Sequence, residues 1–386
     1  MCIIQYSGVQ NGLLSSYMII EIEFTVGVNC HKGMGENAVN RRSDIDWVRT
    51  VSICGVVLLH SASLFVSRQS RVSILGVTPA LLCNQVTRFS VPVFFLLSGL
   101  SLGLSKRPLK LPAFWLHRLR RVGIPYILWS LFYYLFEKHF SFDSVLSVRS
   151  LAAFGRLLLT GGAASHLWFL PVLLQLYFLY PGLKWLIDRH PVMTLPGLLL
   201  LSMFCTLVLS LPLPYTGWWR SRLRRLFPLW VFYFALGMTL TEKRIAQVKD
   251  LAKSHMPVFV MVMVAAAFVY SLDAKITGNL DSVKPQLFLY SPLCFVFLVS
   301  SWDQLERFSE LQSLSAFLAR HSMSIYFSHI VFLRVLRQIS FFNRNSLTMV
   351  LTFAVVMALS TLISIIPELT KRLFNRIKKS RRQHEQ

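Results

Sequence analysis

The chain has 386 residues, of which 54% are hydrophobic and only 15% are charged, and its mean hydropathy is +0.54. Because a soluble domain carries about a quarter charged residues, this composition excludes an ordinary soluble enzyme. The formal net charge of +23 does not indicate a nucleic-acid partner, since the basic residues stand in short clusters between apolar runs, as topology signals do. The long apolar runs predict an all-α polytopic membrane protein, and no alternating β-barrel pattern is visible.

Residues 1–43 precede the first apolar run that is long enough to span a membrane. An apolar stretch within them carries Glu21 and Glu23, and no signal-peptide layout is present. Met34 offers an alternative start just before the first span. We therefore expect residues 1–43 to be a dispensable extension or the product of an incorrectly assigned start, without a catalytic role.

A transmembrane domain is predicted over residues 44–370, followed by a basic cytoplasmic tail over residues 371–386. The domain contains about ten helical runs, each near the length that a hydrocarbon core requires. These runs cover residues 45–66, 78–103, 113–136, 167–187, 192–211, 226–241, 255–272, 285–302, 314–336 and 346–367.

The short basic loops set the orientation of the predicted spans. Lys and Arg gather before the first span, between the second and third, between the sixth and seventh, and after the tenth. All these positions share one side if the number of spans is even, so both termini are predicted to be cytoplasmic. One loop does not follow this pattern: it would lie on the non-cytoplasmic side, yet it carries Arg220, Arg222, Arg224 and Arg225. Either a span is miscounted or these arginines face an anionic ligand.

The first span, "DWVRTVSICGVVLLHSASLF", carries two ionisable side chains on one face. Arg49 and His60 are eleven residues apart, which corresponds to three turns plus roughly 20° and an axial distance of about 16 Å. With Arg49 at the cytoplasmic edge, His60 would lie near the middle of the bilayer, where ionisable groups are costly and indicate function. Histidine can take a proton from a hydroxyl, and arginine can bind phosphate. Two other interpretations stay open: His60 as a hydrogen-bonding group between helices, and Arg49 as a topology anchor.

The cysteines and histidines predict neither a disulfide framework nor a metal site. The six cysteines are scattered without a CxxC pair and are interpreted as small packing residues. The histidines fall in different segments without the spacing of metal ligands. No internal repeat is visible, so an inverted-repeat transporter gains no support.

Five stretches, taken together and in this order, resemble the acyltransferase-3 family of integral membrane O-acyltransferases. They are the Arg49 to His60 interval, "NQVTRFSVPVFFLLSGLSLGLSK" with Arg88, "FWLHRLRRVGIPYILW" with Arg118 and Arg121, "HLWFLPVLLQLYFLYP" with His166 and Trp168, and "LARHSMSIYFSHIVFL" with Tyr326 and His329. The extension before the first span and the arginine-rich loop depart from the pattern but touch none of these motifs.

The resemblance implies acyl transfer, usually of acetyl, from a cytoplasmic acyl-coenzyme A (acyl-CoA) to a hydroxyl of a glycan. The acceptor would be lipopolysaccharide O-antigen or another lipid-linked envelope polysaccharide, and the protein would lie in the bacterial inner membrane. Acetyl-CoA would be a donor substrate, with no permanently bound cofactor and no nucleic-acid partner. His60 would act as the general base, and Arg49 would hold donor phosphate or orient the thioester.

Three further arginines are expected on the donor side. Arg118 and Arg121 would engage the phosphates of the coenzyme, with topology anchoring as the alternative. Arg88 lies inside the second span, where an unpaired arginine is costly. We expect it to join the donor site or to pair structurally with Asp44 or Asp46.

Four residues are expected on the acceptor side. His166 and Trp168 would line the path by which the glycan reaches the site, although Trp168 also suits an interfacial belt. Tyr326 and His329 would contact substrate, with His329 either a second acid/base or a helix-packing group. Two other classes remain in competition with acyl transfer: an exporter of polysaccharide or lipid-linked sugar, and a structural membrane scaffold.

Overall fold

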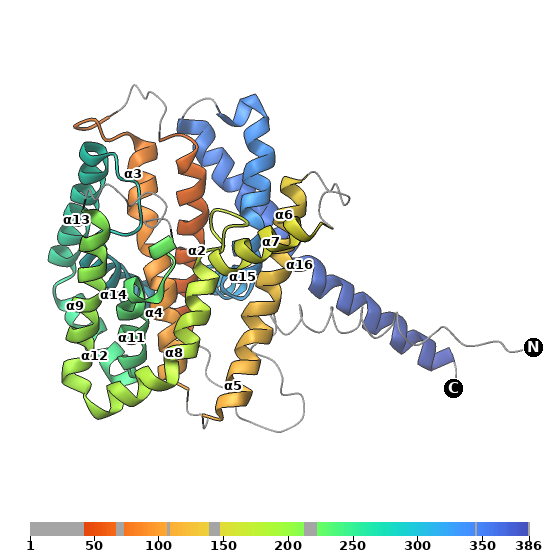
Figure 1. The fold of residues 1–386 in the computed structure, drawn as a ribbon, viewed down its shortest axis with the longest axis horizontal. Coiled ribbons are helices and arrows are strands. Elements are labelled where there is room, and N and C mark those ends of the chain that lie inside the picture. The colour runs from red at the N-terminus through yellow and green to blue at the C-terminus, as the bar shows by residue number, and fades with distance from the viewer. Residues whose placement is uncertain are drawn as a thin grey trace, which may run out of the picture.

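The computed structural model describes residues 42–66, 73–105, 109–138, 147–211, 222–343 and 346–384. Throughout this part of the chain the regular structure is helical, apart from one isolated bridge between Ile74 and Val77 (Figure 1). The α-helices are α2 (Ser43–Ser63), α3 (Pro79–Val86), α4 (Ser90–Gly103), α5 (Leu111–Arg118), α6 (Ile124–Glu137), α7 (Val148–Thr160), α8 (Phe169–Arg189), α9 (Pro191–Ser210), α11 (Val231–Thr239), α12 (Glu242–Ser254), α13 (Met256–Thr277), α14 (Leu287–Leu305), α15 (Ser309–Gln338) and α16 (Ser346–His384). Short 3₁₀ or π turns are η1 (Thr87–Phe89), η2 (Leu119–Gly123), η4 (Phe227–Leu229) and η5 (Ser340–Asn343).

The prediction of an all-α membrane protein is confirmed, whereas the number of about ten spans stays a prediction. Each predicted run coincides with helix, but among the described residues six helices are long and apolar enough to cross a membrane. These cover Ser43–Ser63, Pro79–Gly103, Phe169–Arg189, Pro191–Ser210, Met256–Thr277 and Thr348–Thr370. The cytoplasmic position of both termini also stays a prediction.

The structure describes the predicted C-terminal tail as part of a helix but does not describe most of the predicted N-terminal extension. Residues 1–41 lie outside the described part of the chain, so the expectation for the extension is untested. The predicted tail is continuous with α16, which runs without interruption to His384.

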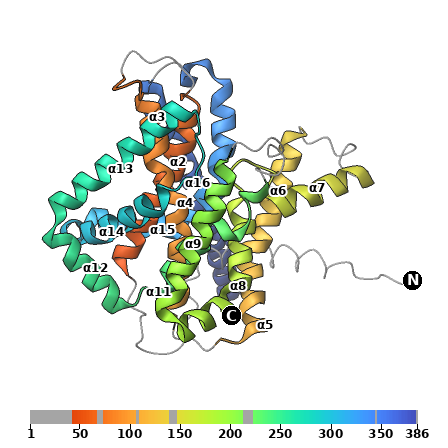
Figure 2. The same cartoon turned by 60° about the vertical axis from the view of Figure 1, so that its left-hand side comes forward.

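Two helices were not predicted as elements. α7 follows a Ser147 cap, and α12 follows a Thr241 cap whose hydroxyl accepts a hydrogen bond from the backbone N–H of Arg244. α12 is polar and only 13 residues long, and it lies at the same end of the bundle as α5 (Figures 1 and 2). We call this the α12 end; the start of α3 lies at the opposite end.

In the arginine-rich loop over residues 220–225, two arginines bind other groups of the protein. Arg224 donates to Asp281 at 2.8 Å, and Arg225 donates to the carbonyl of Thr160 at 2.6 Å. Arg220 lies outside the described residues. These two arginines therefore have protein partners, which favours a structural role over a ligand site in this loop.

α4 and α11 approach so closely that only glycine fits between them. A Cβ added at Gly99 would lie 1.9 Å from the carbonyl oxygen of Phe234, and one at Gly103 would lie 2.5 Å from that of Met238. From the other side, a Cβ at Gly237 would meet the carbonyl oxygen of Leu96 at 2.0 Å. Gly99 therefore serves the close packing of α4 and α11, as in other membrane helix pairs with small residues four apart.

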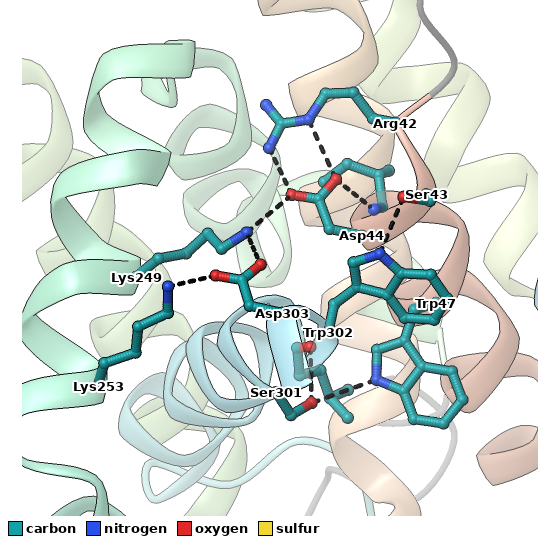
Figure 3. A network of polar contacts seen from close by, with 11 residues as sticks. Arg42, Ser43, Asp44, Trp47, Lys249, Lys253, Ser301, Trp302 and Asp303 are labelled. Carbon is teal, nitrogen blue, oxygen red and sulfur yellow. Dashed lines mark hydrogen bonds and ion pairs between the residues drawn. The ribbon is translucent and has the colours of Figure 1, made fainter. Parts of the chain in front are cut away.

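A polar network fastens the start of α2 to α12 and α14 (Figure 3). Asp44 accepts from Arg42 at 2.6 Å and lies 3.7 Å from Nζ of Lys249. Lys249 also pairs with Asp303, which in turn binds Lys253 at 2.5 Å. Five charged side chains, four from α2, α12 and α14 and one from Arg42 just before α2, thereby connect α12 and α14 to the helix that carries Arg49 and His60.

Two tryptophans extend the same contact. Trp302 donates its indole N–H to the hydroxyl of Ser43 at 2.9 Å, and Trp47 donates to Ser301 at 3.3 Å (Figure 3). Trp302 is buried, so its ring does not face a membrane interface. Its role is to close the α2–α14 contact, because a buried indole N–H needs a partner.

Replacing Asp303 by asparagine is expected to destabilise the folded protein by about 1–2 kcal/mol, because Lys249 is left partly buried with a weaker partner. Burial raises the pKa of Asp303, but hydrogen bonds from Lys249 and Lys253 outweigh it and hold the pKa below the usual 3.8. The stabilisation is therefore present at neutral pH and is lost as the pH falls through the lowered pKa. Thermal unfolding of the wild type and D303N at pH 7 measures the difference; equal melting temperatures would contradict it.

Candidate active site

Three histidines from distant parts of the chain meet inside the bundle. His60 comes from α2, His166 from the turn before α8, and His329 from α15. The ring of His329 lies 5.3 Å from that of His60 and 4.8 Å from that of His166, centre to centre. His60 and His166 are 6.4 Å apart. We call these residues the histidine cluster.

Two tyrosines hold the histidine cluster in place. The hydroxyl of Tyr326 donates to the carbonyl of His166 at 2.5 Å, and its ring lies 5.0 Å from the imidazole. Tyr133 packs against His166 at 5.4 Å and donates to the carbonyl of Phe327 at 2.7 Å. α6, α15 and the turn before α8 are thus fixed around one point.

The hydrogen bonds of His329 define which ring nitrogen carries the proton. Nδ1 lies 2.7 Å from the carbonyl oxygen of Tyr326 and 3.2 Å from that of Ile325. Because carbonyl oxygens only accept hydrogen bonds, Nδ1 must be the donor. In the neutral ring, Nε2 is then the acceptor, and it has no hydrogen-bond partner among the described residues. His329 therefore presents a proton acceptor within the cluster.

The three histidines differ in access. His166 and His329 are buried, with 3% and 0% of their surface exposed, whereas His60 is half-buried. His60 is therefore the member of the cluster that a substrate can reach most directly. α2 ends three residues after His60, so His60 lies in its last turn, nearer the end of the helix than the sequence predicted.

A second group of predicted residues gathers toward the α12 end. Arg121 interacts electrostatically with both Arg118 and Arg49, so the three charges lie near one another. The guanidinium of Arg118 lies 4.9 Å from the ring centre of Tyr177, a cation–π contact. Arg49 lies 3.6 Å from Asp46, one turn earlier on α2. We call Arg49, Arg118 and Arg121 the arginine cluster.

A π-helical turn carries part of the arginine cluster. η2 contains Arg121 and immediately precedes Pro125 in the first turn of α6. Because proline has no N–H to continue the α-helical ladder, a wider turn is accommodated there. Such turns are frequent at functional sites, since they redirect side chains. The run that the sequence predicted over 113–136 is therefore helical, with a π turn where its arginines lie.

Arg88 has its own buried partners. Its guanidinium donates to the side-chain oxygen of Asn84 at 2.8 Å and to the hydroxyl of Ser282 at 2.9 Å. The alternative pairing with Asp44 or Asp46 is wrong, because those carboxylates bind basic residues at the α12 end. Arg88 instead interacts electrostatically with His60, and so belongs to the surroundings of the histidine cluster.

Trp168 lies beside the histidine cluster, two residues after His166. Its ring packs on Trp230 at 5.1 Å, and Trp230 packs on Phe95 of α4 at 5.4 Å. This contact inside the bundle does not suit an interfacial belt. The predicted role in binding the acceptor stays a prediction.

The described residues contain no group of three His, Cys, Asp or Glu side chains arranged to hold a metal ion. The rings of the histidine cluster pack with their centres 4.8–6.4 Å apart. The four cysteines in this part of the chain are free thiols: Cys54, Cys83, Cys205 and Cys294.

Comparison with known protein families gives a match over most of the chain. The model of the acyltransferase-3 family, described as an acyltransferase domain, matches residues 42–368. The chain belongs to the acyltransferase-3 family. No curated protein and no solved structure matches it. The match begins at the residue where the described part of the chain begins, and it covers every residue of both clusters.

In this membrane acyltransferase, the structure brings together most of the residues that the sequence singled out. His60, His166, Tyr326 and His329 share one cluster, and Arg49, Arg118 and Arg121 share the other. The sequence analysis missed Tyr133 and Tyr177. Tyr177 lies three residues before Tyr180 on one face of α8, but nothing in the sequence indicates which helix that face meets.

Two substitutions of His329 are expected to distinguish the roles of its two ring nitrogens. Asparagine places an amide near Nδ1 and loses the acceptor at Nε2, whereas glutamine places an amide near Nε2. If Nε2 orients His60, H329N should lower kcat about 10²-fold at unchanged KM, and H329Q should retain more activity. Kinetics of the two variants in membranes, with melting temperatures as the control for folding, check this. Equal losses would instead indicate that the imidazole only fills space.

Proposed function

We propose that this acyltransferase moves an acyl group, most simply acetyl, from cytoplasmic acyl-CoA to a hydroxyl of a cell-envelope glycan in the bacterial inner membrane. The acceptor would be lipopolysaccharide O-antigen or another lipid-linked polysaccharide. One observation supports the proposal above others: a single helix, α2, contributes Arg49 to the arginine cluster and His60 to the histidine cluster. An anion site and a proton-accepting site are thereby held a fixed distance apart.

The arginine cluster is suited to the donor. Arg118 and Arg121 can pair with the phosphates of the coenzyme, since guanidinium groups bind phosphate by two parallel hydrogen bonds. Arg49 is the member of the arginine cluster that shares its helix, α2, with His60. The positive-inside pattern of the predicted topology assigns the α12 end to the cytoplasm, where acyl-CoA is available. The long pantetheine arm of the coenzyme would carry the thioester from the arginines toward the histidines.

The histidine cluster is suited to the transfer step. A ring nitrogen of His60 accepts the proton of the glycan hydroxyl while its oxygen attacks the thioester carbonyl carbon. The tetrahedral intermediate collapses, the carbon–sulfur bond breaks, and the proton on His60 passes to the departing thiolate. The products are the glycan ester and free coenzyme A, and His60 returns to its neutral form. His329 and His166 act as positioning residues for His60.

The acceptor would reach His60 from the end of the bundle opposite α12. His60 lies in the last turn of α2 and is half-buried, while Trp168 and Tyr326 flank the cluster. Aromatic side chains of this kind present apolar faces to sugar rings and polar edges to their hydroxyls. Arg88, held by Asn84 and Ser282, places a fixed positive charge near the reacting groups.

Membranes containing the protein, acetyl-CoA labelled in the acetyl group and an envelope-glycan extract test the proposal. Transfer of label to alkali-labile ester on the glycan is expected, with release of one coenzyme A for each ester formed. Membranes without the protein are the control. If the protein instead changes the sidedness of the glycan without any label transfer, it is an exporter and the proposal is wrong.

A further inference from the structure

A cavity of about 850 Å³ opens at the α12 end of the bundle, separate from the histidine cluster. It lies between the ends of α4, α8 and α11 and the start of α12. Its volume falls in the range of sites for small ligands and cofactors. The polar residues that line it include Tyr180, Lys184, Thr239, Lys243, Arg244 and Gln247.

The lining of this cavity favours an anion. Lys184, Lys243 and Arg244 face it together with one carboxylate, Asp188. Asp188 is already neutralised by Lys184 at 2.9 Å, so the cavity carries a net positive charge from α12. Arg244 donates to the carbonyl of Thr239 at 2.7 Å, which fixes its guanidinium in the wall.

The cavity lies beside the arginine cluster, separated from it by about one turn of α8. Tyr180 lines the cavity, and its ring lies 5.2 Å from that of Phe114. The guanidinium of Arg118 lies 5.3 Å from the same Phe114 ring and 4.9 Å from that of Tyr177. A ligand that carries two anionic groups and a flat aromatic ring could therefore touch both places at once.

We propose that this cavity binds the adenosine 3′-phosphate end of the acyl donor. Lys243 and Arg244 would receive the 3′-phosphate, Tyr180 would face the adenine, and the arginine cluster would take the diphosphate. This inference rests on the proposed function, because it assigns a place to one part of the donor named there. It makes α12, a helix outside the predicted spans, part of the donor site.

The proposal distinguishes coenzyme A from dephospho-coenzyme A, which lacks only the 3′-phosphate. Binding of both to the purified protein in nanodiscs of zwitterionic lipid is measured by displacement of labelled coenzyme A. The wild type should bind coenzyme A about tenfold more tightly, the effect expected of one charge-assisted contact. K243E should remove that preference by weakening coenzyme A alone. Q247E adds a negative charge to the same wall and should act in the same direction.

The matched control is R307E, which reverses an exposed charge after the end of α14, outside the cavity lining. It should leave both affinities unchanged. Wild-type affinity for coenzyme A in K243E and Q247E, with transfer intact, would overturn this assignment while leaving the proposed function standing. A wild type that binds no coenzyme A would overturn both. Altered binding of anionic lipid in K243E, at unchanged coenzyme A affinity, would assign the cavity to a lipid headgroup and also overturn the proposal.

Discussion

Replacing His60 by glutamine is expected to lower kcat for acyl transfer by about 10²–10⁴-fold, the usual contribution of a general base. Glutamine keeps a polar group of similar length but cannot take a proton at neutral pH. KM for acetyl-CoA should change little, because the proposed donor contacts lie at the arginine cluster, about 16 Å away along α2. Initial rates of ester formation, measured at matched amounts of folded protein, give the comparison.

The control for losing a buried imidazole is H321Q. His321 is buried on α15 but lies outside the histidine cluster, where its nearest charged partner is Glu368 at 3.8 Å. This variant tests whether any buried histidine is needed for a stable bundle. H60Q should be inactive with a melting temperature close to that of the wild type, whereas H321Q should retain transfer once its folded fraction is taken into account. Transfer by H60Q at the wild-type rate would remove His60 from the chemistry.

The difference between the two clusters shows what the sequence could predict about the site. The Arg49–His60 relation is local: eleven residues at the helical repeat bring both to one face, and α2 is a continuous helix over this interval. The meeting of His60 with His166 and His329 depends on how α2, α15 and the turn before α8 pack. No spacing along the chain encodes that contact, so the sequence predicts His166 only on the acceptor path and leaves the role of His329 open.

The fold shows the same division between local and tertiary information. Apolar runs predicted the helices because burial in lipid requires them. The sequence did not predict α12, because a short polar helix at the end of a bundle has the same basic composition as a loop between spans. Its place in the bundle depends on contacts of Lys249 with Asp44 and Asp303, which are remote in sequence. Likewise, Arg88 was recognised as costly, but Asn84 and Ser282 as its partners follow only from packing.

Replacing Gly99 by alanine is expected to destabilise the protein by about 1–3 kcal/mol, the cost of overpacking a close contact. The added methyl would lie 1.9 Å from the carbonyl oxygen of Phe234, and backbone must move to make room. The matched control is G197A on α9, where a Cβ meets nothing within 4 Å. There alanine should be neutral or stabilise the helix slightly, because it loses less conformational entropy than glycine.

G99A should lower kcat as well as the melting temperature, because α4 is connected to the active site. Phe95, one turn before Gly99 on α4, packs against Phe169 at 4.5 Å, and Phe169 packs against Tyr326 at 5.8 Å. A displaced α4 therefore moves the tyrosine that holds His166. Melting curves and initial rates of G99A and G197A, in the same lipid, measure both effects. We expect G99A to melt lower and to lose kcat in its folded fraction; a G99A protein as stable and active as G197A would mean that α4 and α11 can separate without disturbing the histidine cluster.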